Sequence, residues 1–476
     1  MKTVDLLIKN GIVITMEGPG TGIINDGSVA IEGGKIVAVG ETAEVCREYD
    51  GHRVIDARNK VVMPGFIDCH AHSCDAIVRG LAQDVDNWLY KAIWPITSNL
   101  NPDDIQVGSL LHIAESVLNG TTTICDMVYN ADIIVKNHLK IGNRVILTEM
   151  IHENPSDIFR YDPMDVYPFD HSVGEGKFAR CRKLVEQYQG YSDDLVTVMV
   201  GPQAINMVSL ELMDELHHYA VSNDLHIHIH VSQSDRENVQ VEKRYGKRAV
   251  PLLNDRGYLG RHVMAAHISH ATRPEVKMMA DSGARMILCS NSIAIINGVL
   301  PPAAEYLEYG GTVGLGTDQA PGNNRNNMFS EMKSSAVLNK YKLHSGTAFP
   351  AWKLLRMATI EAAKTVGLDS IIGSLRPGKK ADIIIVDMTR PELSPLYLEP
   401  IRNVVPNLVY AADGSEVETV IVDGRIIVEE RKLLHADLAL LVNEANRHAS
   451  EISKRLSAFD GLGNLPVAKF TAEGLY

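Results

Sequence analysis

The chain has 476 residues, of which 45% are hydrophobic and 22% charged, and its formal net charge at pH 7 is -13. This composition excludes a largely disordered chain, and the acidic balance argues against a nucleic-acid partner because phosphate binding needs clustered lysine and arginine. The six cysteines form no CxxC pair, and charged residues interrupt the apolar runs of the N-terminal segment. We therefore expect reduced thiols, no signal peptide, no membrane partner and a cytoplasmic location.

The first sixty residues predict short strands separated by turns. Gly33 and Gly34 lie between two β-rich runs, which is a hairpin signal. The same alternation of strand and turn returns near the other end of the chain, at 381–388 and 417–431. We predict that the two ends join into one small β-sandwich domain, made of residues 1–60 plus 373–436.

Eight short β-rich or apolar runs lie between these ends, and most are separated by segments long enough for a helix. This repeated alternation is typical of a parallel (β/α)8 barrel, so we predict an α/β fold with a TIM-like barrel over residues 61–372. A doubly wound open sheet is the alternative. The eight runs are 64–70, 121–126, 144–150, 196–201, 225–230, 263–267, 285–290 and 312–317.

Two further segments fall outside this repeat. The stretch 151–190 is longer than a normal crossover and carries Phe159, Tyr161, Tyr167 and Phe169, which predict either an aromatic lid over a substrate site or packing on a neighbouring subunit. Residues 437–476 predict a C-terminal helical segment whose apolar face is available for a homo-oligomer, a dimer or higher.

Metal-ligand residues fall at the ends of several predicted strands, where barrel enzymes place catalytic groups. His70 and His72 lie two apart on an extended segment, so both imidazoles project to the same side. Such a pair alone is more often structural than functional. The weight comes from His230, at the end of the fifth run, and from Asp318, which follows the eighth.

These four residues predict a metal site. Three imidazoles and a carboxylate suit one divalent ion per subunit, Zn²⁺ first and Mn²⁺, Co²⁺ or Fe²⁺ as alternatives, and such an ion lowers the pKa of bound water to about 7. Asp318 can then accept a proton from that water, while His267, at the end of the sixth run, stabilises charge on the substrate. We predict a metal-dependent hydrolase of a small molecule.

Stretches such as VVMPGFIDCHAH, HIHVSQS, AAHISH, VGLGTD and GSLRPGKKADIIIVD follow one another along the chain. In this order they resemble the amidohydrolase superfamily, and within it the branch of triazine hydrolases and S-adenosylhomocysteine or guanine-type deaminases. The resemblance implies a mononuclear site of His70, His72, His230 and Asp318. It also implies that His267 contacts the reacting group and that the protein is an oligomer.

Two positions depart from the pattern of that family. Family deaminases and triazine chlorohydrolases carry glutamate three residues after the fifth-strand histidine, where it protonates a ring nitrogen, and this chain has Gln233 there. The histidine of the GPHA motif is replaced by Gln203. Because an amide cannot act as a general acid, and such assistance contributes about 10² to 10⁴ in rate, we expect a substrate that needs no ring protonation.

This expectation selects a substrate class. A small hydrophobic urea, carbamate or thiocarbamate would have its carbon-nitrogen or carbon-sulfur bond cleaved, as in the phenylurea and molinate hydrolases that the chain resembles, in xenobiotic degradation. The alternative is a deaminase or dechlorinase of a purine, pterin or s-triazine ring, with His228 or His270 as the acid. A catalytically inactive barrel kept for binding is a third account, and the surviving ligand-type positions speak against it.

Two tryptophans follow the first predicted strand, where relatives place pocket walls. We expect Trp88 and Trp94 to contact the substrate, together with Gln203, Gln233 and His270. The alternative for the tryptophans is packing on the barrel or on a dimer partner.

Overall fold

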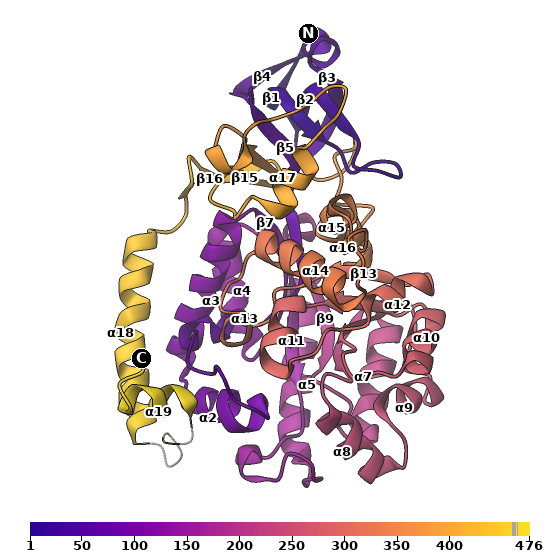
Figure 1. Cartoon of the computed structure of the whole chain (residues 1–476), viewed down its shortest axis with the longest axis vertical. Coiled ribbons are helices and arrows are strands. Elements are labelled where there is room, and N and C mark those ends of the chain that lie inside the picture. Colours follow the sequence, from indigo (N-terminus) through magenta and orange to yellow (C-terminus); the bar gives the residue numbers. More distant parts are fainter. Residues whose placement is uncertain (459–462, 464) are drawn as a thin grey trace.

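The computed structural model describes residues 1–458, 463 and 465–476. It consists of a barrel and a smaller β domain, which lies above the barrel in the view of Figure 1. The first strands, drawn in indigo, lie in the smaller domain together with β15 (Val417–Val422) and β16 (Arg425–Glu429), drawn in orange. Segments far apart in the sequence therefore build that domain together.

Eight parallel strands form the barrel, and neighbours in the sheet are also neighbours in the sequence. A parallel bridge between Ala71 and Asp318 joins the two ends of the sheet, and the Asp318 amide donates to the His70 carbonyl at 2.8 Å. The predicted (β/α)8 barrel is confirmed, and the open-sheet alternative is excluded. The strands are β6 (Phe66–Ala71), β7 (Thr121–Val128), β8 (Arg144–Ile151), β9 (Val196–Pro202), β10 (Ile227–Val231), β11 (Val263–His267), β12 (Arg285–Leu288) and β13 (Thr312–Leu315).

Side chains near β6 and β13 hold the barrel closed. The buried carboxylate of Asp68 accepts hydrogen bonds from the Thr317 amide at 2.9 Å and from the Thr317 hydroxyl at 2.5 Å. Gly316 permits a close approach, because a Cβ atom at this position would lie 2.9 Å from the Cβ of His70. The closure therefore brings His70 beside Asp318, two of the predicted metal ligands.

The helices surround the strands and leave the strand ends to the loops. Paired side-chain caps fix where two helices begin: Asn101 with Asp104 at α3, and Thr272 with Glu275 at α10. The helices of the barrel region are α3 (Pro102–Leu118), α4 (Ala131–Ile141), α5 (His171–Tyr188), α6 (Tyr191–Asp194), α7 (Leu210–Ser222), α8 (Asp235–Tyr245), α9 (Ala249–Asp255), α10 (Arg273–Ser282), α11 (Ser290–Asn297), α12 (Ala303–Glu308), α13 (Ala320–Asn323), α14 (Met328–Lys342), α15 (Ala351–Met357) and α16 (Ile360–Val366).

The smaller domain is a nine-stranded sheet in which β5 pairs antiparallel with β14. Val13, Val62 and Ile383 are buried in its core, and the buried Arg144 at the start of β8 pairs with Asp382 beside β14. The prediction of a small β domain from both chain ends is confirmed. Its elements are β1 (Lys2–Ile14), β2 (Ile23–Glu32), β3 (Lys35–Glu41), α1 (Thr42–Glu48), β4 (Tyr49–Asp56), β5 (Lys60–Pro64), β14 (Ile383–Asp387), η4 (Pro391–Leu393), α17 (Val404–Tyr410), β15 (Val417–Val422), β16 (Arg425–Glu429) and β17 (Lys432–Leu433).

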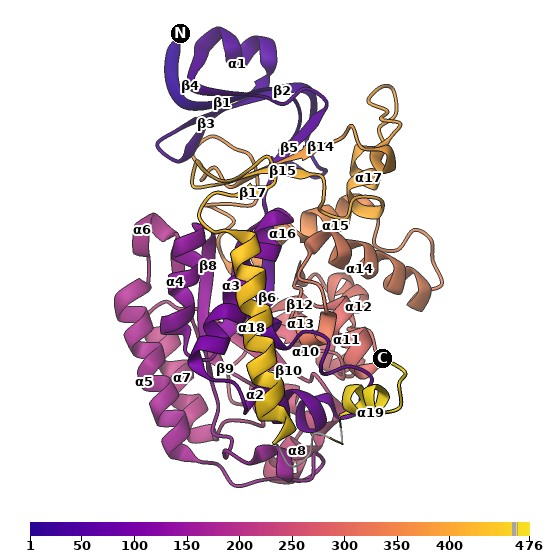
Figure 2. The same ribbon diagram turned by 90° about the vertical axis from the view of Figure 1, so that its left-hand side faces the viewer.

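The C-terminal segment is helical, with α18 (Leu438–Ser457) and α19 (Pro466–Ala472); residues 459–462 and 464 of it lie outside the described residues. Figure 2 shows α18 running along the barrel, and its contacts include α3. Leu441 and Ile452 are buried, and both His448 and Arg455 pair with the buried Asp104. This face of α18 is therefore covered by the same chain, and the oligomeric state stays a prediction. Among the described residues, none of the helices is long and apolar enough to cross a membrane.

Candidate active site

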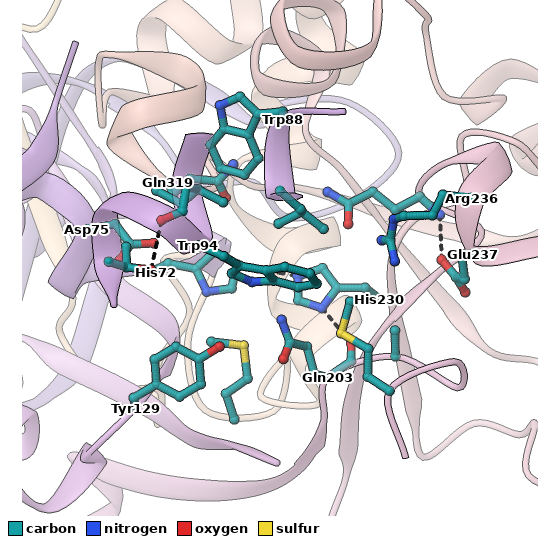
Figure 3. A pocket seen from close by; sticks show the side chains of 17 residues that line it. His72, Asp75, Trp88, Trp94, Tyr129, Gln203, His230, Arg236, Glu237 and Gln319 are labelled. Carbon is teal, nitrogen blue, oxygen red and sulfur yellow. Dashed lines mark hydrogen bonds between the residues drawn. The ribbon is translucent and has the colours of Figure 1, made fainter. Parts of the chain in front are cut away.

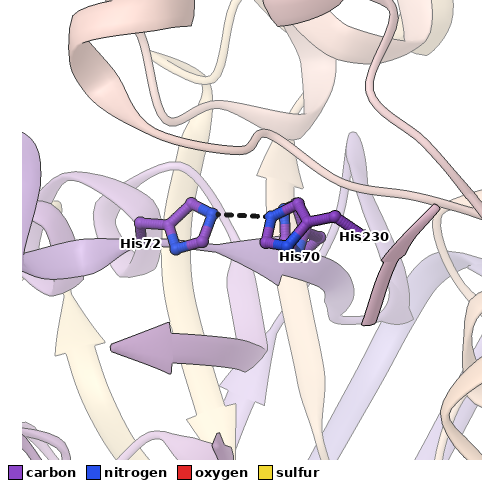
Figure 4. Close-up of side chains that lie close together, drawn as sticks. All are labelled: His70, His72 and His230. Atoms are coloured by element: carbon purple, nitrogen blue, oxygen red, sulfur yellow. Dashed lines mark hydrogen bonds between the residues drawn. The ribbon is translucent and has the colours of Figure 1, made fainter. Parts of the chain in front are cut away.

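Four predicted ligands converge at the C-terminal end of the barrel. Figure 4 shows the rings of His70 and His72, from β6 and the residue after it, close to the ring of His230 from β10. The Nε2 atoms of His72 and His230 lie 3.3 Å apart. The Oδ1 atom of Asp318 lies 3.5 Å from the Nε2 atom of His70 and 3.5 Å from that of His72. Donors from three separate stretches of the chain thus surround one point.

The outward ring nitrogens of the histidines are already engaged. The Nδ1 atoms of His72 and His230 lie 2.6 Å and 2.7 Å from the backbone carbonyls of Met127 and Gln203. Because a carbonyl only accepts, both Nδ1 atoms carry the proton and both Nε2 atoms present a lone pair to the cluster. This is the tautomer that a metal ligand requires.

The ring of His70 contacts a further histidine, His228. The Nδ1 atom of His70 lies 2.8 Å from the Nε2 atom of His228, whose other ring nitrogen lies 3.5 Å from the Sγ atom of Cys125. His228, considered above as a general acid, therefore lies behind His70 and does not line the pocket described below.

Burial leaves several of these nitrogens without hydrogen-bond partners. The Nε2 atom of His70 and both ring nitrogens of His267 have none among the described residues, and each such atom costs about 1 to 3 kcal/mol. Burial, followed by the neighbouring imidazoles, lowers the pKa of His70 well below its usual value, and burial lowers the pKa of His230 to about 4. Neutral imidazoles with free lone pairs beside a carboxylate fit a divalent metal site.

The carboxylate of Asp318 is held in a fixed orientation. The Ser292 hydroxyl donates to its Oδ2 atom at 2.6 Å, and the Nε2 atom of His267 lies 3.9 Å from the same oxygen. Asp318 and His267 have φ values of 63° and 77°, a left-handed conformation that costs roughly 1 to 3 kcal/mol at a non-glycine residue. Interactions in the surrounding structure therefore offset this conformational cost and hold the two side chains in place.

A narrow inner pocket with a volume of ≈ 50 Å³ lies over the cluster (Figure 3). This volume is smaller than the roughly 150 Å³ of an apolar cavity that holds benzene, and the pocket shares lining residues with two larger cavities. Four of the predicted substrate contacts line this pocket: Trp88, Trp94, Gln203 and Gln233. The tryptophans bracket the π-helical turn η2 (Leu89–Ile93), and the second one begins the short α2 (Trp94–Thr97).

The fifth predicted contact lies farther out. His270 lines an outer cavity that shares Trp88, Gln233 and Arg236 with the inner pocket, and its Nδ1 atom lies 3.0 Å from the Oδ1 atom of Asp235. His270 therefore does not reach the inner pocket in this structure.

Sequence reasoning missed three charged residues of the pocket wall, Asp75, Arg236 and Glu237. Asp75, on the 3₁₀ turn η1 (Ser73–Val78), lies three residues after His72, and burial raises its pKa to about 6. Arg236 lies in the first turn of α8, with its guanidinium carbon 5.4 Å from the centre of the Tyr90 ring. The available signal was a carboxylate one turn after a predicted metal ligand, in the otherwise uncharged run SCDAIV.

A closed barrel with histidine and aspartate donors at its strand ends defines a class of metal-dependent hydrolases. Residues 61–427 match the model of the Amidohydrolase family. The chain therefore belongs to the amidohydrolase family, as the resemblance in its motifs implied, and it is a hydrolase of carbon-nitrogen bonds. Residues 29–51 also match an imidazolonepropionase-like composite domain of bacteria.

Relatives and solved structures refine the comparison. The chain is 34% identical to a 5'-deoxyadenosine deaminase of Methanosarcina mazei over 95% of this chain and 100% of that protein, and 32% identical to a 5-methylthioadenosine/S-adenosylhomocysteine deaminase of Pelotomaculum thermopropionicum over 95% and 99%. A zinc-bound adenosine deaminase from Xanthomonas campestris superimposes with a TM-score of 0.87 at 28% identity, covering 95% of this chain and 99% of that one. The zinc complex of atrazine chlorohydrolase from Arthrobacter aurescens, at 22% identity and a TM-score of 0.82, covers 93% of this chain and 100% of that one and shows the same fold. These findings favour the ring-deaminase alternative over the urea and thiocarbamate interpretation.

Proposed function

We propose that the protein deaminates an adenosine-type nucleoside, with one zinc ion held by His70, His72, His230 and Asp318. The observation that carries the proposal is the convergence of these donors in a chain that matches nucleoside deaminases over almost its whole length. When bound, such an ion supplies the Lewis acidity that makes water a nucleophile at neutral pH.

Residues of and around the cluster can carry out the proton transfer and stabilise the added oxygen. Asp318, oriented by Ser292, accepts a proton from the attacking water and returns it to the departing amine. The unpartnered ring nitrogens of His267 are free to hydrogen-bond the oxygen that is added to the ring carbon. These are roles for side chains that the structure already holds in place.

Gln233 has the role of holding the ring. Its carboxamide NH₂ can donate to a ring nitrogen but cannot transfer a proton, so we expect deamination that is slower than with a carboxylic acid at this position. Gln203 contributes an acceptor, because its buried Oε1 atom has no partner among the described residues.

The outer cavity suits the sugar. Its lining includes Asp86, Asn87 and Asp235, and oxygen acceptors of this kind can hydrogen-bond ribose hydroxyls. The base would then lie in the inner pocket, over the cluster, and the sugar would lie nearer to solvent.

The direct test is ammonia release by zinc-loaded protein from adenosine, 5'-deoxyadenosine, 5-methylthioadenosine and S-adenosylhomocysteine. We expect turnover of at least one, loss of turnover after chelation, and recovery on adding zinc. Failure of all four with metal-loaded protein would contradict the proposal.

A second candidate is hydrolysis of a substituted urea, and the amides at positions 203 and 233 favour it, because a metal-polarised carbonyl needs no ring protonation. It predicts release of an aryl amine from a phenylurea by a protein that is inactive on the four nucleosides.

A further inference from the structure

A second cavity, which we call the side chamber, adjoins the inner pocket. The two share Asp75, Trp94, Thr97 and Tyr129 in their walls. The side chamber has a volume of ≈ 340 Å³, whereas about 150 Å³ is enough to hold benzene. It therefore has room for a group the size of a phenyl ring. Apolar side chains form much of its wall: Leu100, Ile105, Ile158, Phe159 and Val173.

The carboxylate of Asp75, at the junction of the two cavities, has spare acceptor capacity. Its Oδ1 atom receives the Cys74 thiol at 3.5 Å, and it forms no other side-chain hydrogen bond within the part of the chain that the structure describes. Glu237, the other carboxylate of the inner pocket wall, differs: its two oxygens accept the backbone amides of Ser232 at 2.8 Å and Gln233 at 2.9 Å. A substrate N–H group could therefore donate to the carboxylate of Asp75, which has acceptor capacity left.

The charges around the side chamber also favour a hydrogen-bond donor. Asp75 and Asp170 contribute carboxylates, and the described lining contains neither lysine nor arginine. Burial lowers the pKa of His152, a further lining residue, well below its usual value, so this imidazole is neutral at pH 7. An anionic group would be repelled, whereas a neutral group carrying an N–H would be accepted.

The two neighbouring cavities lie on opposite sides of the inner pocket. Figure 3 shows Asp75 and Tyr129 on one side of the pair His72 and His230, and Arg236 and Glu237 on the other. The outer cavity adjoins the pocket through Arg236, Trp88 and Gln233, and the side chamber adjoins it through Asp75 and Tyr129. A nucleoside with its sugar in the outer cavity therefore directs the far side of its base, with the exocyclic amine, toward Asp75.

We propose that the side chamber binds an apolar substituent on the leaving amine, that Asp75 accepts the N–H of this amine, and that N6-substituted adenosines are substrates. This inference rests on the proposed nucleoside deaminase function. The oxygen of water bonds to C6 while the C6–N6 bond breaks. One proton of the water goes to the departing amine and the other to the ring nitrogen N1, so the products are a 6-oxopurine nucleoside and a primary amine, without any oxidation or reduction.

The test compares N6-benzyladenosine with adenosine on the zinc-loaded full chain, measuring benzylamine, ammonia and the common nucleoside product. Burying a phenyl-sized group is worth about tenfold or more in affinity, so we expect kcat/KM for the benzyl compound to equal or exceed that for adenosine. Val173→Trp fills the side chamber and should lower the ratio of the two kcat/KM values by about tenfold or more. Asp75→Ala should lower kcat/KM for both compounds, because both carry an N–H on the leaving amine. Glu175→Trp, an exposed position on the same helix, is the matched control and should leave the ratio unchanged.

Binding provides a readout that is independent of turnover. Calorimetry on chelated protein should show N6-benzyladenosine binding more tightly than adenosine, with the difference lost in Val173→Trp or, if that variant is unstable, in Ser156→Trp at the chamber's exposed rim. The inference would be overturned if the protein turned over adenosine but neither released benzylamine from the benzyl compound nor bound that compound more tightly. The deaminase function would then remain intact. Chamber-dependent binding without ammonia from any nucleoside would instead overturn the deaminase function and support the chamber as a binding site.

Discussion

The donor cluster and the pocket wall are built in different ways. The cluster residues lie at the ends of barrel strands or directly after them, and second hydrogen bonds fix His72, His230 and Asp318. The wall lies on short turns such as η1, η2 and α2, and the carboxylate of Asp75 has a single weak partner. The barrel strands therefore position the candidate metal donors, whereas short inserted elements supply part of the pocket wall.

Removing a residue of the donor cluster should have the largest effect on activity. We expect His230→Ala to lower kcat/KM by about 10⁴-fold or more, because water activation contributes several kcal/mol, and to lower the zinc content. His226→Ala is the control on the same segment, since His226 contacts Arg285 and lies outside the cluster. Full activity in His230→Ala would show that this histidine does not bind the metal.

A substitution in the pocket wall should alter the rate of deamination and leave the zinc content unchanged. Gln233→Glu supplies a general acid, and we expect about 10²-fold faster deamination of adenosine with unchanged zinc content. Gln106→Glu, exposed on α3, controls for the added charge. An unchanged or lower rate in Gln233→Glu would mean that this side chain does not hold the ring.

A smaller effect is expected for the group that orients Asp318. Ser292→Ala removes a hydrogen bond to a carboxylate, worth about 1.5 to 3 kcal/mol, so we expect kcat to fall by about 10- to 100-fold with KM and zinc content almost unchanged. Ser335→Ala, which removes a hydroxyl bonded to Ser290, is the control. A large rise in KM with normal kcat would assign Ser292 to substrate binding instead.

The smallest effect concerns stability and pH. Burial raises the pKa of Glu237 to about 7 from its usual 4.5, so the folded state binds a proton that the unfolded state has lost between these values. This contribution to stability is fully present below pH 4.5 and is lost as the pH rises to about 7.

We therefore expect the unfolding free energy to fall less between pH 4.5 and 7 in Glu237→Gln than in the wild type. The expected difference is on the order of 1 to 3 kcal/mol. Burial also raises the pKa of Asp68 to about 7 and that of Glu331 to about 8, so the measured quantity is the difference between variant and wild type in chelated protein. Identical slopes would contradict the assignment.

Local sequence patterns were sufficient to predict the barrel and to place the candidate donors at its strand ends. Apolar runs separated by helix-length segments predicted eight strands, and the alternation in β6 and β10 showed that His70, His72 and His230 would project from strand ends. Closure then brought Asp318 to them, as the fold class requires. The alternation along the strands and the family resemblance of the motifs together carry these predictions.

The pocket wall could not be predicted in the same way. Asp75 reaches the pocket because η1 turns it inward, and the side chamber exists because segments around Trp94, Tyr129 and Phe159 meet in space. The substrate class was predicted from two neutral amides, Gln203 and Gln233, whereas the similarity of the whole chain to nucleoside deaminases favours the ring-deaminase alternative.

Zinc binding by the donor cluster is tested most directly by an anomalous difference map, recorded at the zinc absorption edge from crystals of the zinc-loaded protein. We expect one peak at about 2.0 to 2.2 Å from the Nε2 atoms of His70, His72 and His230 and from a carboxylate oxygen of Asp318. A map with no peak inside this cluster, or with the zinc bound elsewhere, would contradict it.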